Sequence, residues 1–133
     1  MQKRLNKLIF LVIIFISMMS RVIAKENKNL VNVYLFYSDT CYYCSLERDL
    51  WDDLVKKYDN IRVYEYEVSS DENIKLLDGV SELFDTSVTR VPVTIIGEKL
   101  YKGFSYEDSK ARFMAVIEYY SEYGYTDIVG EYI

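Results

Sequence analysis

The chain has 133 residues, half of them hydrophobic, with 16 basic against 21 acidic side chains and no histidine. The composition is that of a folded domain rather than a disordered tail, and the negative balance disfavours nucleic acid as a partner. Without histidine, the usual activating base of Ser and Cys nucleophiles and the commonest transition-metal ligand are both absent. Chemistry must therefore come from thiols, carboxylates or the backbone.

Residues 1–24 have the pattern of a secretory signal peptide. Three basic residues precede an apolar run over residues 8–19, and Ala24 is suited to the last position before cleavage. The run has 12 residues, fewer than the ~20 that span a bilayer, but an extension through Ile23 would let it persist as a tilted anchor. Removal of residues 1–24 would leave 12 basic against 21 acidic residues. We expect a signal peptide or an N-terminal membrane anchor, an extracytoplasmic location, either secreted or membrane-anchored, and a linker over residues 25–29.

The first half of the remaining chain predicts a strand, a helix and a second strand. Residues 30–37 are almost wholly apolar, β-branched or aromatic, as in a strand buried on both faces. Residues 61–68 alternate, as in a strand with one less buried face. Between them, apolar residues recur at helical spacing: Leu46, Leu50, Trp51, Leu54, Val55 and Tyr58. This order predicts a βαβ unit.

The second half predicts a helix, two strands and a helix. The segment after residues 69–73 predicts a helix with Gly79 inside it, followed by strands over residues 88–96 and 99–104 that form an antiparallel hairpin. Pro92 would lie at a strand start or edge. A last helix would begin at Ser105, with Asp108 in a capping-box-like position, and end at Gly124. Residues 30–124 thus predict an α/β domain of order βαβαββα, and the apolar tail, residues 125–133, is expected to dock on it.

The two cysteines, Cys41 and Cys44, lie where the first strand gives way to the first helix. Unpaired N–H groups and the helix dipole would lower the pKa of Cys41 there, making it the attacking thiolate, while Cys44 resolves the mixed disulfide. A structural cross-link is a weaker reading, because so short a loop restricts the unfolded chain by only ~2 kcal/mol. A zinc site is weaker still, because it would lack two ligands. We expect no metal ion and no cofactor apart from the redox-active disulfide.

The stretch "YSDTCYYC" after the first strand and "TRVPVTII" about fifty residues later resemble the thioredoxin-like superfamily over nearly the whole mature chain. The resemblance implies a central mixed sheet flanked by helices and a thiol-disulfide oxidoreductase that exchanges disulfides with exported proteins. It implies a cis Pro92 against the cysteine loop, with Val91 offering backbone hydrogen bonds to a bound peptide or thiol. A membrane or extracytoplasmic redox partner would recycle the cysteines. Tyr42 and Tyr43 form either a substrate-contacting rim or ordinary half-buried packing.

Three positions depart from thioredoxins proper, which have Trp before the first cysteine, Gly-Pro between the cysteines and a buried aspartate beneath them. Thr40, the Tyr-Tyr pair and Leu35 occupy these positions here. The stretch around the cysteines is more similar to glutaredoxins and disulfide isomerases.

The missing aspartate leaves the proton acceptor for Cys44 open. It would be water or another carboxylate, and Glu65, Glu67 and Asp39 are the candidates, each better explained as a solvated surface charge. Two other functions also stay open: a redox-inactive peptide-binding or accessory protein on the same scaffold, and a glutathione-linked enzyme of glutaredoxin type.

Overall fold

The computed structural model describes residues 1–19 and 28–133. The predicted cleavage point after Ala24 and most of the predicted linker lie outside the described residues. Helix α1 spans Gln2–Met19. Within the two described ranges, no helix combines the length and the apolar character needed to cross a membrane.

The core of the fold is a four-stranded mixed sheet with the order β2-β1-β3-β4. Strand β1 (Val31–Tyr37) runs parallel to β2 (Ile61–Glu67) and antiparallel to β3 (Val93–Ile96), which pairs antiparallel with β4 (Lys99–Lys102). The two inner strands are the most apolar ones, and every residue of β3 is buried. The predicted α/β class and strand directions are confirmed, because inner strands covered on both faces need continuous apolar runs.

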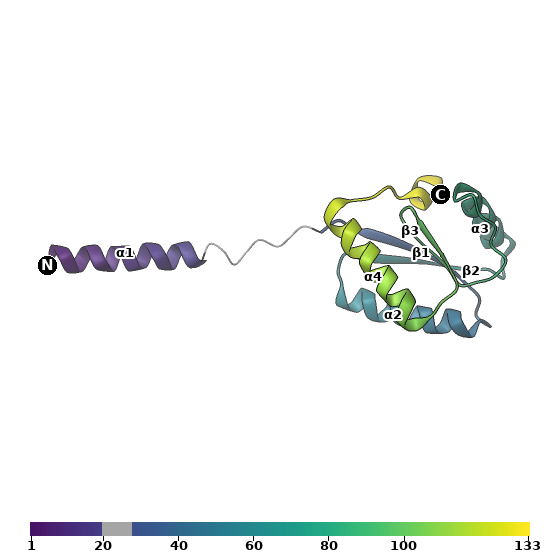
Figure 1. Ribbon diagram of the computed structural model, residues 1–133, viewed down its shortest axis with the longest axis horizontal. Helices are drawn as coiled ribbons and strands as arrows, with labels where there is room; N and C mark the ends of the chain where they lie inside the picture. Colours follow the sequence, from purple (N-terminus) through teal and green to yellow (C-terminus); the bar gives the residue numbers. More distant parts are fainter. Residues whose placement is uncertain (20–27) are drawn as a thin grey trace.

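Helices cover both faces of the sheet, as Figure 1 shows. Helices α2 (Tyr42–Lys57) and α4 (Tyr106–Tyr123) pack on one face, where their buried side chains join Val33, Leu35 and Ile96 of the strands. Helices α3 (Asp71–Leu83) and α5 (Ile128–Tyr132) pack on the other face, against Phe36 and other strand residues. The two apolar clusters are the cores that hold the sheet between its helices.

Two local expectations need correction. The predicted strand over residues 88–96 begins only at Val93, because Pro92 has no N–H with which to extend the ladder. Pro92 therefore lies at the strand start, one of its two predicted positions, and not at an edge, since β3 is an inner strand. Helix α4 begins after Ser105 as predicted, but the Ser105 side chain makes no cap. Instead the Ser105 N–H donates to Ser109 Oγ (3.0 Å), and Asp108 pairs with Arg112.

The tail docks on β1. The Asn32 N–H donates to the Tyr125 hydroxyl (2.7 Å). Asp127 Oδ2 accepts hydrogen bonds from Asn32 Nδ2 (2.8 Å) and from the Tyr34 hydroxyl (2.9 Å). Val129 is fully buried in the apolar cluster on the α3 side of the sheet. The tail therefore packs against that cluster and is part of the folded domain, as predicted.

Candidate active site

The cysteine pair lies at the start of α2. Cys41 is the N-cap residue, and its Sγ accepts a hydrogen bond from the Cys44 N–H (3.2 Å). The two sulfurs form a disulfide. Cys41 is partly exposed, whereas Cys44 is fully buried. The predicted capping position of Cys41 is confirmed, and a helix N-terminus is a position that favours a thiolate in general.

The loop before β3 brings Val91 and Pro92 against the cysteines. The Val91–Pro92 peptide bond is cis, as the resemblance implied. Cys41 Sγ lies 3.7 Å from the Val91 carbonyl oxygen, which a reduced Cys41 thiol could use as an acceptor. The β1–β3 pairing carries this loop to the end of the sheet where α2 begins. Two segments fifty residues apart thus form one site.

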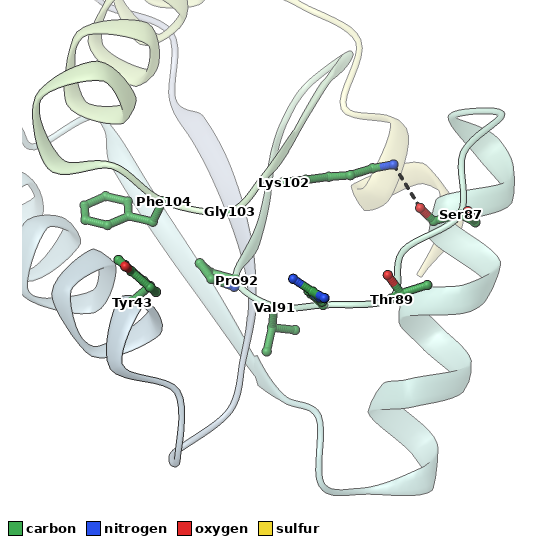
Figure 2. A pocket seen from close by; sticks show the side chains of 9 residues that line it. Tyr43, Ser87, Thr89, Val91, Pro92, Lys102, Gly103 and Phe104 are labelled. Carbon is green, nitrogen blue, oxygen red and sulfur yellow. Dashed lines mark hydrogen bonds between the residues drawn. The ribbon is translucent and has the colours of Figure 1, made fainter.

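The two tyrosines between the cysteines are both on the surface. Tyr42 is 71% and Tyr43 58% exposed, and their rings meet edge to face. Tyr43 lines a groove of about 460 Å³ beside the disulfide, and Tyr42 does not. Val91 and Pro92 also line this groove, which Figure 2 shows from close by.

Sequence reasoning missed five other residues that line this groove and carry a ring, a charge or a hydroxyl: Phe104, Arg90, Lys102, Ser87 and Thr89. Phe104 follows β4, Lys102 ends β4, and the other three belong to the loop before β3. Nothing in their local pattern marks them, because the groove exists only once the loop before β3 lies beside the end of β4.

The most important residue that the sequence reasoning missed is Glu47. It is 0% exposed and is the only charged residue in the core formed by the described part of the chain. Oε1 accepts hydrogen bonds from Trp51 Nε1 (3.2 Å) and from the Thr94 hydroxyl. Oε2 has no partner among the described residues. Burial raises the pKa of Glu47 to about 7, and the hydrogen bonds from Thr94 and Trp51 oppose this only in part.

The side chain of Glu47 is buried on the side of α2 that also carries Cys44. Glu47 follows Cys44 by three residues on α2, so the two side chains lie on the same helix face. Thr94, which holds the carboxyl, is paired across β1 and β3 with Leu35. Leu35 occupies the strand position where thioredoxins proper carry their aspartate. A carboxyl therefore reaches the neighbourhood of that position from the helix instead of the strand.

A sequence signal for Glu47 did exist. Cys44, Glu47, Trp51 and Leu54 recur at three- to four-residue spacing, and all four are buried. An acidic residue inside an apolar helical stripe is the anomaly that marks it, since buried carboxyls are rare unless they have a partner or a task.

The three predicted proton acceptors lie outside the core. Arg48 pairs with Glu65 (2.9 Å) and, more distantly, with Asp39 (3.7 Å). Hydrogen bonds from Ser69 lower the pKa of Glu67. The structure thus supports the surface explanation for all three, and the buried carboxyl comes from a residue not among them.

Comparison with known proteins gives only distant matches. No protein-family model and no curated protein sequence matches the chain. Among solved structures, an uncharacterized thioredoxin-like protein from Clostridium perfringens is 17% identical, with a TM-score of 0.49 over 74% of this chain and 79% of that one. Mitochondrial thioredoxin 3 from Saccharomyces cerevisiae, in its oxidized form, is 18% identical, with a TM-score of 0.45 over 69% and 81% of the two chains.

The described residues contain no group of three or more acidic or cysteine side chains able to hold a metal ion. The disulfide at the start of a helix, beside a groove, supports a redox function in general. The strand order, the Cys41–Cys44 pair at the start of α2 and the position of that pair against Val91-Pro92 identify the fold of this chain as thioredoxin-like.

Proposed function

We propose that the protein is a thiol-disulfide oxidoreductase that exchanges disulfides with exported proteins. The observation that carries the proposal is the asymmetry of the pair: Cys41 is partly exposed at a helix N-terminus and lies against Val91, which lines the groove, while its partner Cys44 is fully buried. A disulfide that only held the chain together would need no accessible sulfur. An exchange reaction needs one sulfur within reach of substrate and a second behind it.

The exchange transfers two electrons. In the reducing direction the Cys41 thiolate attacks a substrate disulfide, forms a mixed disulfide and releases one substrate thiolate. The Cys44 thiol then gives up its proton and attacks Cys41 Sγ, which re-forms the Cys41–Cys44 disulfide and expels the second substrate thiolate. Oxidation of a substrate dithiol is the same sequence in reverse, so the potentials of the two couples set the direction.

We assign the proton transfer at Cys44 to Glu47. Cys44 is buried away from water, so its proton needs an acceptor inside the protein, and Glu47 lies one helical turn away. A group whose pKa is about 7 can both take and return a proton near neutral pH. Oε2, which has no partner among the described residues, is the atom left to do so.

Substrate would bind across the groove next to Cys41. The backbone of Val91 offers hydrogen bonds to an extended peptide, and Pro92 lines the groove beside it. The exposed ring of Tyr43 in the groove, and that of Tyr42 next to it, supply adaptable apolar contact. Outside the cytoplasm a redox partner would return the cysteines to their working state.

The proposed location rests on residues 1–24, whose basic start, apolar run and Ala24 fit export. N-terminal sequencing of the protein isolated from cells tests it, together with the access of external protease to intact cells. Cleavage after Ala24 means release, while an intact N-terminus in the membrane fraction means anchoring. A protease-protected, uncleaved protein would contradict export.

The decisive experiment compares three variants of the full chain in the reduction of insulin. Cys41→Ser should abolish the activity. Cys44→Ser should accumulate mixed disulfides with partner proteins, and the Cys41→Ser/Cys44→Ser double variant is the matched control that should capture none. Activity that survives Cys41→Ser would contradict the proposal, and cellular function that survives the double variant would favour a redox-inactive accessory protein.

A further inference from the structure

The groove beside the disulfide has two chemically different ends. In Figure 2, Tyr43 and Phe104 lie on one side of Pro92, and the hydroxyls of Ser87 and Thr89 lie on the other, beyond Val91. The Lys102 side chain reaches from β4 to this second end. The groove therefore offers apolar walls near the cysteines and polar groups farther along the loop.

All the formal charge on the walls of the groove is positive. Arg90 and Lys102 line it, and no Asp or Glu does. The ion pairs among the described residues involve Arg48, Lys56 and Arg112, and neither of the groove's cations. The chain has 21 acidic against 16 basic residues, yet the groove is lined by two cations and by no carboxylate.

Lys102 is held in place by the loop it faces. Its ammonium donates to the Ser87 carbonyl oxygen (2.9 Å) and contacts the Thr86 hydroxyl. An ammonium has three N–H donors, so one remains for a ligand. Arg90, which directly precedes Val91, carries a guanidinium with five donors and a permanent charge. The two cations thus flank the path that a peptide along Val91 would follow.

We propose that this groove selects substrate segments that carry an acidic side chain within a few residues of the reacting cysteine. The inference rests on the proposed function and names its substrate class. An apolar side chain of the segment lies against Tyr43 and Phe104, and the carboxylate meets Arg90 and Lys102. Glutathione also carries carboxylates, but it has no apolar side chain for the aromatic end, so a protein segment fits the groove better.

The charge preference acts mainly on the rate of association. The cations are solvent-exposed, and exposed ion pairs contribute modestly and weaken with salt. We expect about a fivefold preference for an acidic over a basic substrate at low ionic strength, which shrinks as salt is added.

The test uses the reduced full-length protein and two disulfide-bonded peptides that differ only in a Glu or a Lys near the cysteine. The second-order rate constant of disulfide exchange is measured for each peptide at low and high salt. Wild type should prefer the Glu peptide, and Arg90→Glu should remove or reverse the preference. Lys99→Glu is the matched control: it makes the same charge change at an exposed cation of β4 that does not line the groove, and it should keep the preference.

Each result separates this inference from the proposed function. Equal rates for the two peptides, or an Arg90→Glu variant that keeps the preference, would overturn the inference while leaving the exchange activity intact. An absence of exchange with both peptides would contradict the proposed function itself. Glutathione disulfide is the third substrate, and if it reacts faster than the Glu peptide and loses that advantage in Arg90→Glu, the groove selects a small thiol and the protein-segment assignment is wrong.

Discussion

Cys44 and Glu47 lie one helical turn apart on the buried face of α2, and both side chains are fully inaccessible to solvent. A carboxyl in this position is costly when ionised, because no cation contributes to holding its charge and burial alone raises its pKa to about 7. Tyrosines pack against this side of the core, and burial raises the pKa of Tyr101, Tyr120 and Tyr125 above the ordinary value of 10.0, so these three phenols carry no charge near pH 7. The ionisation of Glu47 is therefore tied chiefly to its burial and to the adjacent thiol.

The first prediction concerns Glu47→Gln and the rate of disulfide reduction. Reduction of the Cys41–Cys44 bond by a dithiol expels Cys44 as a thiolate, and protonated Glu47 is its proton donor. The wild-type rate, divided by the fraction of the dithiol present as thiolate, should fall as pH rises through about 7. The rate of Glu47→Gln should not show this fall with pH, and at pH 6 the variant should react about a hundredfold more slowly than wild type.

Stopped-flow fluorescence of Trp51, the single tryptophan of the chain, measures that rate. Glu65→Gln, which changes a surface carboxylate on β2, is the matched control and should keep the wild-type profile. An unchanged pH profile in Glu47→Gln would remove Glu47 from the proton transfer.

The second prediction concerns stability. The folded protein binds the Glu47 proton more tightly than the unfolded chain does, since the pKa is about 7 in the fold against an ordinary value of 4.5. The resulting contribution to the free energy of unfolding is on the order of 3 kcal/mol. It is fully present below pH 4.5 and is lost as the pH rises through about 7. Urea unfolding of the oxidised protein at several pH values should show that the free energy of unfolding of Glu47→Gln rises relative to that of wild type as the pH increases across this range. The difference between the two proteins is the quantity to follow, because groups with lowered pKa values, such as Glu67, act in the opposite direction. A constant difference would be inconsistent with a raised pKa.

The third prediction concerns Thr94→Val, which keeps the shape of the side chain but removes the hydroxyl that donates to Glu47. This hydrogen bond lowers the Glu47 pKa, so its loss should move the pKa above about 7. Trp51 donates to the same carboxyl oxygen, so its fluorescence follows the titration directly. The midpoint should move to higher pH in Thr94→Val and stay in place in Thr89→Val, an exposed threonine outside the core. A shift to lower pH would contradict the assigned hydrogen bond.

The fourth prediction concerns the tail. Asp127→Ala removes the acceptor of the Tyr34 hydroxyl and the Asn32 amide, and part of the cap of α5. The free energy of unfolding should fall by about 2 kcal/mol, because buried donors are left without partners. Glu131→Ala, at an exposed site on the same short helix, should change it little. Urea unfolding measures both, and equal losses in the two variants would mean that the tail is held by apolar contact alone.

Local patterns were enough to predict most of the elements. The apolar run of β1 and the helical stripe of α2 each reflect burial that the chain encodes over neighbouring residues. The capping position of Cys41 followed from the same two patterns. The strand pattern ends at Tyr37 and the helical pattern begins a few residues later, so the N-cap of the helix had to lie in the short segment between them, which contains Cys41. The strand predicted over residues 88–96 exists but begins only at Val93, because Pro92 outweighs the β-propensity of the residues before it.

The proposed proton acceptor, Glu47, was missed, although an acidic residue inside the apolar stripe of α2 was a local signal for it. The choice among Glu65, Glu67 and Asp39 considered residues near the cysteines in the chain or on the next strand, and all three are held at the surface. Glu47 belongs to the apolar stripe of α2, but Thr94, which donates a hydrogen bond to its carboxyl, is 47 residues away in the chain. Only the β1–β3 register and the packing of α2 on the sheet bring the two together.

The sequence by itself determined the class of the domain: an acidic α/β domain without histidine, with one pair of thiols at a strand-to-helix junction. Periodicity and capping are local properties, so they can be read along the chain. The tertiary structure decided which carboxyl is buried one helical turn from Cys44, which cations line the groove and where the tail docks. These depend on contacts between residues far apart in the chain, and such contacts are fixed by the packing of helices on a sheet, which no local pattern records.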